Sequence, residues 1–197
     1  PTGANITFNV FPQNGQTNNI WGMASDAELQ AGVRDVKFGG SNNGDSLYED
    51  FVPCFTPGAL VSTVKGLVAV ENLQVGDRVM TRDNGLQPIR WIGSQFVGAK
   101  ALADTPKLLP IRIKANALGK NMPQEDLIVS PQHRILVRSK VTERMFDDKE
   151  VLVAAKHLLD VDGIDILTET QEVEYFHFMF DQHEVVFANG AETESLY

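Results

Sequence analysis

The sequence predicts an all-β protein made of many short strands. From residue 54 onward, short runs of β-branched and aromatic residues alternate with turn residues, and helical periodicity is scarce. Hydrophobic residues make up 43% of the 197 residues, which is enough to build an ordinary buried core. Many short strands separated by frequent turns are typical of a β-barrel or β-sandwich.

Residues 1–50 differ in composition from the rest, because Gly and Asn are dense there. Such clusters favour turns and flexible connections. Two short strands are expected at 6–11 and 33–38. One helical turn is expected at 25–30, capped by Ser25. We expect residues 1–53 to form an N-terminal flank, a flexible arm or the tail of an upstream domain, and residues 54–197 to form the compact β domain.

Two hairpins are predicted early in the β domain. Strands at 60–64 and 67–70 flank a Lys-Gly turn, and strands at 78–82 and 87–92 flank Asp83-Asn84-Gly85. Asn-Gly is a strong hairpin signal, because both residues accept a positive φ at little cost. The best short helix is 155–159. Further strands are expected at 109–113, 127–129, 134–137, 151–154, 172–180 and 184–187.

Charge and cysteine content narrow the function. Seventeen Lys and Arg against 26 Asp and Glu give a net charge of −9, which argues against binding to nucleic acid or an anionic membrane. The longest apolar runs, such as 151–155, are far shorter than the roughly 18 residues of a membrane span. The single cysteine, Cys54, excludes an internal disulfide and a thiolate-rich zinc cluster.

The chain begins at Pro1 without a leader sequence, so we expect a fragment of a longer protein. Localisation therefore stays open, and a secreted or surface-associated bacterial parent protein is one candidate. We expect a monomer.

Two segments carry candidate chemistry. Cys54 lies between the flank and the β domain, and it is either a small buried hydrophobe or a nucleophile. Ser130-Pro131-Gln132-His133 places a hydroxyl and an imidazole three residues apart at the end of an apolar strand. The proline bend could aim both side chains into one pocket, or Ser130 could cap a turn beside a structural histidine.

Together these segments resemble the Hint (hedgehog/intein) module, most closely its bacterial intein-like variety. The resemblance extends from Cys54 to about Gly190. The opening nucleophile block and the Thr-x-x-His block, which here has Ser in place of Thr, are specific in combination. The four matching blocks are residues 54–63 (CFTPGALVST), 70–79 (VENLQVGDRV), 130–133 (SPQH) and 175–190 (YFHFMFDQHEVVFANG).

The resemblance implies a Hint-type β fold and a self-cleaving activity at the Pro53–Cys54 bond. The sulfur of Cys54 would attack the carbonyl of Pro53 and convert the amide into a thioester. His133 would protonate the departing nitrogen, with Ser130 hydrogen-bonded near the scissile bond. General-acid help of this kind contributes typically 10²–10⁴-fold. No metal and no organic cofactor would be needed.

The end of the sequence departs from the intein pattern, since no His-Asn pair precedes a Cys, Ser or Thr. Asn189 is followed by Gly190, which offers no splicing nucleophile. We therefore expect cleavage or acyl transfer of the N-terminal flank to water or a small amine or thiol, not protein splicing. No sterol-recognition extension follows, so cholesterol has no support as the acceptor. The rigid ring of Pro53 is expected to hinder attack on its carbonyl.

The three other histidines differ in how well each fits a catalytic role. His177 lies where inteins often carry an Asp that assists the acyl shift, so it is a further candidate catalytic residue. In a strand it would share a face with Tyr175 and Met179. His183 is a weaker candidate at the end of that strand, and His157 is expected on the surface.

Two other functions compete with self-processing. Cys54 and His133 could form a thiolate–imidazole pair that hydrolyses other molecules, but such enzymes usually set the cysteine at a helix N-terminus, and residues 55–58 do not favour a helix. A non-catalytic binding module is the other alternative. Residues 39–47 faintly resemble one glycine- and aspartate-rich calcium repeat, although a single copy cannot supply enough oxygen ligands.

Overall fold

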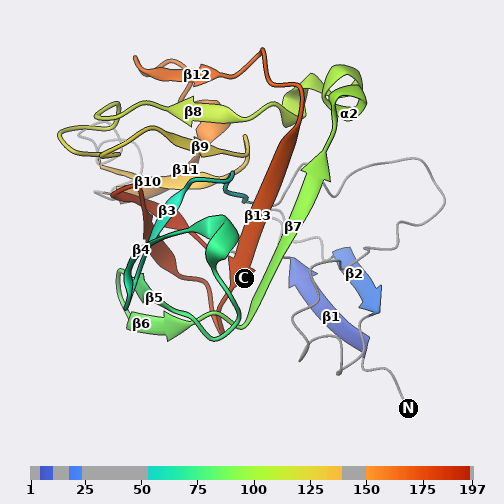
Figure 1. The fold of residues 1–197 in the computed structure, drawn as a ribbon, viewed down its shortest axis with the longest axis vertical. Helices are drawn as coiled ribbons and strands as arrows, with labels where there is room; N and C mark the ends of the chain where they lie inside the picture. Colours follow the sequence, from blue (N-terminus) through green and yellow to red (C-terminus); the bar gives the residue numbers. More distant parts are fainter. Residues whose placement is uncertain (1–4, 11–17, 24–52, 139–149, 196–197) are drawn as a thin grey trace.

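The computed structural model describes residues 5–10, 18–23, 53–138 and 150–195, and these are predominantly β-strands (Figure 1). The predicted all-β class is confirmed. The expected strand at 33–38, the helical turn at 25–30 and the glycine-rich segment 39–47 lie outside the described residues. Of the flank, the structure describes an antiparallel pair of strands, β1 (Asn5–Val10) and β2 (Asn18–Met23).

An eight-stranded sheet forms the largest part of the domain. Its centre is the hairpin of β14 and β15, and β3 and β10 flank that hairpin on either side. β4 pairs with β3 as the first predicted hairpin, and β6 pairs with β5 as the second. Its strands are β3 (Leu60–Thr63), β4 (Gly66–Ala69), β5 (Arg78–Thr81), β6 (Gly85–Pro88), β10 (Arg134–Arg138), β11 (Glu150–Ala154), β14 (Val185–Ala188) and β15 (Ala191–Glu194).

Two smaller sheets complete the domain. A long two-stranded ribbon of β7 (Trp91–Val97) and β13 (Val173–Met179) runs along one side of it (Figure 1). A three-stranded sheet places β8 (Ile111–Ile113) between β9 (Leu127–Val129) and β12 (Ile164–Ile166). The described helices are short: α2 (Ala99–Asp104) and three 3₁₀ turns, η1 (Val70–Asn72), η2 (Pro106–Leu108) and η3 (Ala155–His157).

The structure differs from the sequence-based expectations at a few elements. The helix expected at 155–159 is reduced to the single 3₁₀ turn η3. The single strand expected at 87–92 is divided between the end of β6 and the start of β7, and most of β7 was not predicted. Elements that were not predicted at all are β2, β12, β15, α2, η1 and η2. β15 is the important omission, because its polar sequence Ala-Glu-Thr-Glu carries no apolar alternation, yet β14 and β10 enclose it in the sheet.

The core consists of two clusters of unequal size. The main cluster lies between the sheets and contains, among others, Phe55, Ile111, Ile135 and Phe178. A smaller cluster surrounds Cys54 and is built from residues of β7, α2, η2 and β13. Its buried members are Cys54, Val97, Leu102, Leu108, Val173 and Tyr175. The predicted nucleophile therefore lies in apolar packing of its own, beside the main core.

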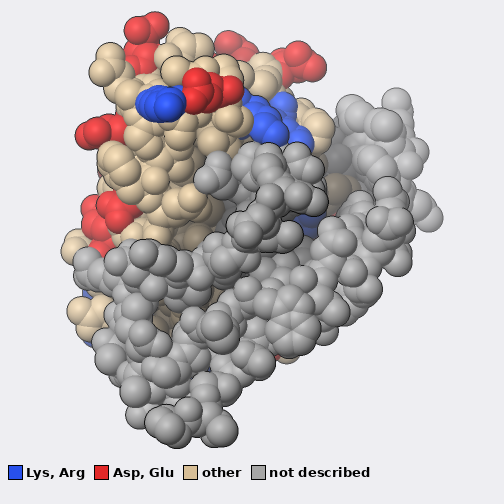
Figure 2. All heavy atoms as spheres, turned by 90° about the vertical axis from the view of Figure 1, so that its right-hand side faces the viewer, with Lys and Arg blue, Asp and Glu red and all other residues tan. Residues whose placement is uncertain are grey.

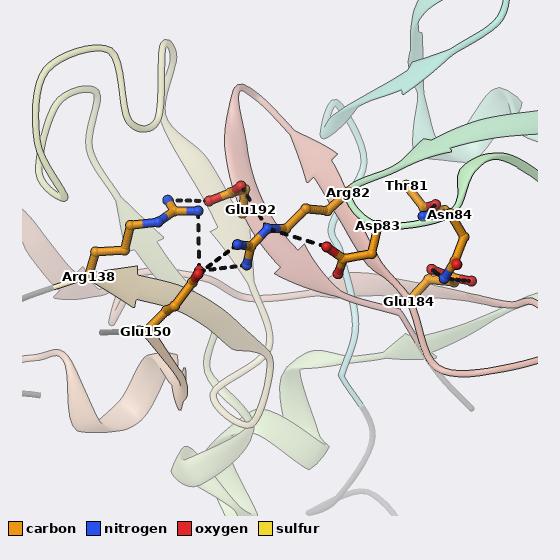
Figure 3. A network of polar contacts seen from close by, with 8 residues as sticks. All are labelled: Thr81, Arg82, Asp83, Asn84, Arg138, Glu150, Glu184 and Glu192. Atoms are coloured by element: carbon orange, nitrogen blue, oxygen red, sulfur yellow. Dashed lines mark hydrogen bonds and ion pairs between the residues drawn. The ribbon is translucent and has the colours of Figure 1, made fainter. Parts of the chain in front are cut away.

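A network of charged side chains connects β10, β11 and β15 with the residue that follows β5 (Figure 3). Arg82, after β5, pairs with Glu150 of β11 and lies near Glu192 of β15, while Arg138 of β10 pairs with both glutamates. Alternating signs keep the four side chains neutral as a group. Asn84 separately donates two hydrogen bonds of 3.0 Å to Glu184.

The described surface carries no single-sign field on the face shown in Figure 2, where Asp and Glu are scattered and basic side chains gather near the top of the view beside acidic ones. Among the described residues, no helix is long and apolar enough to cross a membrane.

Candidate functional site

Residues 54–56 are held by backbone pairing at the meeting point of two strands. Phe55 forms isolated bridges to Val129 of β9 and to Phe176 of β13. Its N–H donates to the Phe176 carbonyl, and its carbonyl accepts from the Phe176 N–H, both at 2.8 Å. This pair of hydrogen bonds fixes the backbone on the C-terminal side of the predicted scissile bond, so Cys54 has little freedom to move relative to the sheet.

Ser130 binds the backbone of Cys54 on both sides. The N–H of Cys54, which is the nitrogen of the Pro53–Cys54 amide, donates to Ser130 Oγ at 3.0 Å. The N–H of Ser130 in turn donates to the Cys54 carbonyl at 2.9 Å. A hydroxyl on this nitrogen is the hydrogen-bonding partner that the family resemblance implies for Ser130.

The thiol of Cys54 faces His177. Sγ lies 3.4 Å from His177 Nδ1. The alternation predicted for this strand is present. Tyr175 packs in the small cluster with Cys54, while Phe176 and Phe178 pack in the main core. His177 therefore lies beside the sulfur because the odd-numbered side chains of β13 point toward Cys54.

Trp91 covers the other side of the His177 ring. The two rings stack with centroids 4.8 Å apart and planes 29° apart. Gly93 lies directly opposite His177 in the β7–β13 ladder. A Cβ at Gly93 would lie 2.6 Å from the Trp91 indole, so only glycine leaves room for the indole to fold back over the imidazole.

Burial keeps the Cys54–His177 pair neutral. Cys54 is 7% exposed, and desolvation raises the pKa of its thiol to about 12, although a hydrogen bond with Ser130 acts in the opposite direction. Desolvation lowers the pKa of His177 to about 4. A thiol and a neutral imidazole therefore face each other at neutral pH. The hydroxyl of Tyr175 donates to the Leu108 carbonyl at 2.7 Å. Burial, with a smaller electrostatic contribution from Cys54, raises the pKa of this hydroxyl.

His133 lies one turn beyond Ser130 and is completely buried. The backbone N–H of His133 donates to the Ser130 carbonyl at 3.0 Å. The His133 ring packs edge-on against the Phe55 ring, with centroids 4.4 Å apart. Nε2 is hydrogen-bonded to Thr193 Oγ1. Desolvation lowers the pKa of His133 to about 3, so the imidazole is neutral.

The structure thus brings the four predicted site residues together, three of them in direct contact and one indirectly. Cys54, Ser130 and His177 are in direct contact, whereas His133 is linked to them through the Ser130 carbonyl and the Phe55 ring. His183 is paired with Glu194 at 3.3 Å, and His157 is exposed at the end of η3, as expected. Sequence reasoning missed Trp91 and Thr193, because each acts through a partner that is distant in the chain.

Asn189 has a structural role in the described chain. Asn189 and Gly190 form the tight turn between β14 and β15, with φ values of 47° and 78°. The Asn189 side chain accepts from the Leu60 N–H at 2.6 Å and donates to the Asp126 carbonyl at 2.8 Å. Both ends of its amide are therefore occupied in holding β14 against β3 and the loop before β9.

The surroundings of Cys54 differ from those of a hydrolase cysteine. No helix begins at residue 54, and the thiol pKa is raised instead of lowered. Within the described ranges no three His, Cys, Asp or Glu side chains gather as a metal site would need.

Comparison with known proteins assigns the class of this domain. The Hint domain model matches residues 53–197, which include the paired backbone of Cys54 and all four predicted site residues. Proteins with this fold are self-processing domains, and the described β architecture agrees with it. The chain belongs to the Hint domain family.

Similar solved structures include inteins and an intein-like domain. The bacterial intein-like domain from Clostridium thermocellum is 16% identical over 73% of this chain and 98% of its own, with a TM-score of 0.48. A DnaB intein from a Synechocystis species is 14% identical over 74% of this chain and 100% of its own, with a TM-score of 0.44. No curated protein matches the chain significantly.

Proposed function

We propose that this domain performs an intramolecular N-to-S acyl shift at the Pro53–Cys54 bond and then releases or transfers its N-terminal flank. The observation that carries the proposal is the pair of contacts made by one residue. The sulfur of Cys54 meets a neutral imidazole at 3.4 Å, and the scissile nitrogen of Cys54 meets a hydroxyl at 3.0 Å. A base at the nucleophile and a hydrogen-bonding group at the leaving nitrogen are what acyl transfer from an amide requires.

The first half of the reaction is attack by sulfur. His177 Nδ1 accepts the thiol hydrogen bond and draws the proton away as Sγ bonds to the Pro53 carbonyl carbon. The attacking sulfur and the acyl carbon belong to adjacent residues, so the chain itself supplies proximity. Trp91 holds the imidazole plane by stacking, which limits the orientations in which Nδ1 can face the sulfur.

The second half is departure of the nitrogen. The carbon–nitrogen bond breaks as the carbon–sulfur bond completes the thioester, and the nitrogen becomes the free amine of Cys54. That nitrogen takes up one proton to replace the one that sulfur lost, so atoms and charge balance. In this proposal the proton comes from His177, and His133, whose backbone N–H donates to the Ser130 carbonyl at 3.0 Å, is its last carrier. Ser130 orients the nitrogen through its hydroxyl. A positioned acid of this kind is worth typically 10²–10⁴-fold.

The thioester is then open to water or to a small amine or thiol. Attack by such an acceptor separates the flank that ends at Pro53 from the domain that begins at Cys54. The substrate is thus the domain's own N-terminal flank. Splicing is not proposed, because Asn189 is engaged in the β14–β15 turn and is followed by Gly190.

The test is intact mass spectrometry of the purified chain over time, with and without dithiothreitol or hydroxylamine. We expect a thiol-accelerated or hydroxylamine-accelerated fragment that ends at Pro53, together with a complementary fragment that begins at Cys54. Cys54→Ala should show neither fragment. Persistence of the intact mass under all these conditions, in a folded sample, would contradict the proposal.

The same experiment separates self-processing from hydrolysis in trans. An intramolecular shift gives a first-order rate that does not change with protein concentration. A rate that rises with concentration, or cleavage of added Cys54→Ala chain by the unmodified chain, would instead indicate a hydrolase acting on other molecules.

A further inference from the structure

His133 is anchored through one ring nitrogen by a residue that the sequence did not single out. Thr193 lies on β15 and is fully buried, as is His133. Thr193 Oγ1 is hydrogen-bonded to His133 Nε2 and also donates to the Arg134 carbonyl at 3.0 Å. β15 pairs with β10 through Ile135 and Thr193, so the backbone ladder fixes where this hydroxyl lies.

The hydrogen count at Thr193 determines the direction of the bond to His133. A threonine hydroxyl has one hydrogen and two lone pairs. Its hydrogen is used toward the Arg134 carbonyl, so Oγ1 must accept from His133. Nε2 therefore carries the proton of the neutral imidazole, and Nδ1 is left with a bare lone pair.

The other ring nitrogen of His133 stands out in the described chain. Nδ1 is fully buried and has no hydrogen-bond partner among the described residues. Buried polar atoms are nearly always paired, so an unpaired one needs an explanation, and a catalytic role is one that such atoms have. The bare nitrogen belongs to the residue that the proposed function uses as the proton carrier.

We propose that Thr193 is a positioning residue that holds neutral His133 as the Nε2–H tautomer, so that the Nδ1 lone pair is available to carry the proton of the acyl shift. This inference rests on the proposed function. It assigns to β15 a chemical role in addition to its place in the sheet.

The assigned tautomer lets the proton balance close at His133. In the proposed step His177 takes the thiol proton first. That proton ends on the leaving nitrogen with the bare Nδ1 of His133 as its last carrier, so both histidines end the step as they began. The opposite tautomer would present an N–H at Nδ1 and a lone pair to Thr193. It could not accept a proton at Nδ1, and delivering its own would leave an imidazolate. Errors of tautomer at a catalytic histidine cost up to about 10⁴-fold.

The first measurement concerns the tautomer and needs no change at residue 193. The Cys54→Ala chain, which cannot cleave itself, is labelled with ¹⁵N-histidine, and long-range ¹H–¹⁵N correlation spectra report which ring nitrogen carries the proton. His133→Gln identifies the His133 signals. We expect a neutral Nε2–H form down to pH 5. A proton on Nδ1, or a mixture of tautomers, would overturn the inference.

The second measurement compares the rate of thioester cleavage in Thr193→Val and Thr193→Ser, in chains with an intact Cys54. Valine keeps the shape and removes the hydroxyl, so we expect cleavage to slow about 10²-fold and the His133 tautomer to become mixed. Serine keeps the hydroxyl and should recover the rate to within about threefold and restore the tautomer.

The outcomes distinguish the inference from the proposed function. Equal rates in Thr193→Val and the unmodified chain, with cleavage still dependent on Cys54, would overturn only the role of Thr193. Absence of cleavage in the unmodified chain would overturn the proposed function and the positioning role with it. Should Thr193→Val fail to fold, the tautomer measured in the Cys54→Ala chain decides.

Discussion

Cys54, His133 and His177 are all uncharged near neutral pH. The pKa of Cys54 is raised to about 12, and those of His133 and His177 are lowered to about 3 and 4. A cysteine hydrolase instead keeps a thiolate ready for repeated use. A domain that acts once on its own backbone gains from a neutral thiol, because a buried thiol does not react before the proton can be drawn to His177.

Replacement of His177 tests whether contact with the sulfur matters. His177→Gln keeps a polar side chain of similar length but removes the base, so we expect thioester formation to slow about 10²–10⁴-fold. His183→Gln is the matched control, because His183 lies in the same sequence block but pairs with Glu194. Both rates are read from intact mass over time. Equal loss of rate in the two variants would remove His177 from the mechanism.

The three pKa values also predict the pH dependence of cleavage. Both histidines are already neutral above about pH 5, and the thiol stays protonated below about pH 11. No group of the acyl shift therefore titrates between about pH 5 and pH 9, and the rate of the shift should be nearly flat there.

The measurement is the rate of thioester formation at saturating hydroxylamine, corrected for the ionisation of hydroxylamine itself. An inflection near pH 6.5 would show a histidine with an ordinary pKa and would contradict the burial argument. Below about pH 5 the rate should fall, because His177 becomes protonated and can no longer accept the thiol proton.

At the scale of elements, the site depends on the hairpin of β14 and β15. Its two-residue turn needs positive φ at both Asn189 and Gly190, and this turn sets the register that brings Thr193 beside β10. The hairpin also joins the two halves of the large sheet, because β3 pairs with β14 and β10 pairs with β15.

Gly190→Ala should therefore destabilise the domain. The φ of 78° costs a residue with a Cβ roughly 1–2 kcal/mol, and the added Cβ would lie 2.8 Å from the flexible Gln124 side chain. The free energy of unfolding is measured by urea denaturation. Gly98→Ala is the control, because Gly98 has φ −85° and a Cβ there would make only an ordinary contact. A loss in Gly98→Ala as large as that in Gly190→Ala would contradict the strain argument.

The same elements show what the sequence could predict. Turn dipeptides located the hairpin at 60–70 and the turn of the second hairpin, whose second strand was expected at 87–92 and lies at 85–88. The β alternation located the face of β13 that carries His177. β15 was missed, because its burial comes from its neighbours in the sheet and not from apolar residues of its own. Thr193 and Trp91 were missed for a related reason. Their partners, His133 and His177, are 60 and 86 residues away along the chain (193 − 133; 177 − 91).

At the scale of the whole molecule, the residues that bury Cys54 form a cluster separate from the main core that holds the sheets together. The main core holds the sheets together, whereas the small cluster mainly excludes water from one thiol. Leu108 belongs to the small cluster at 6% exposed, and Leu73 belongs to the main core at 4%. Two leucines of nearly equal burial thus differ in whether they belong to the cluster that contains Cys54.

Leu108→Ala and Leu73→Ala should each lower the free energy of unfolding by about 2–5 kcal/mol, because both leave a cavity in packed surroundings. Only Leu108→Ala should also change the thiol. Water that enters the space beside Cys54 would weaken the desolvation that raises its pKa, so the thiolate would form at lower pH. The pH dependence of alkylation by iodoacetamide, measured without denaturant, reports this pKa. A larger drop in Leu73→Ala than in Leu108→Ala would mean that global loosening, and not the local cluster, controls the reactivity of Cys54.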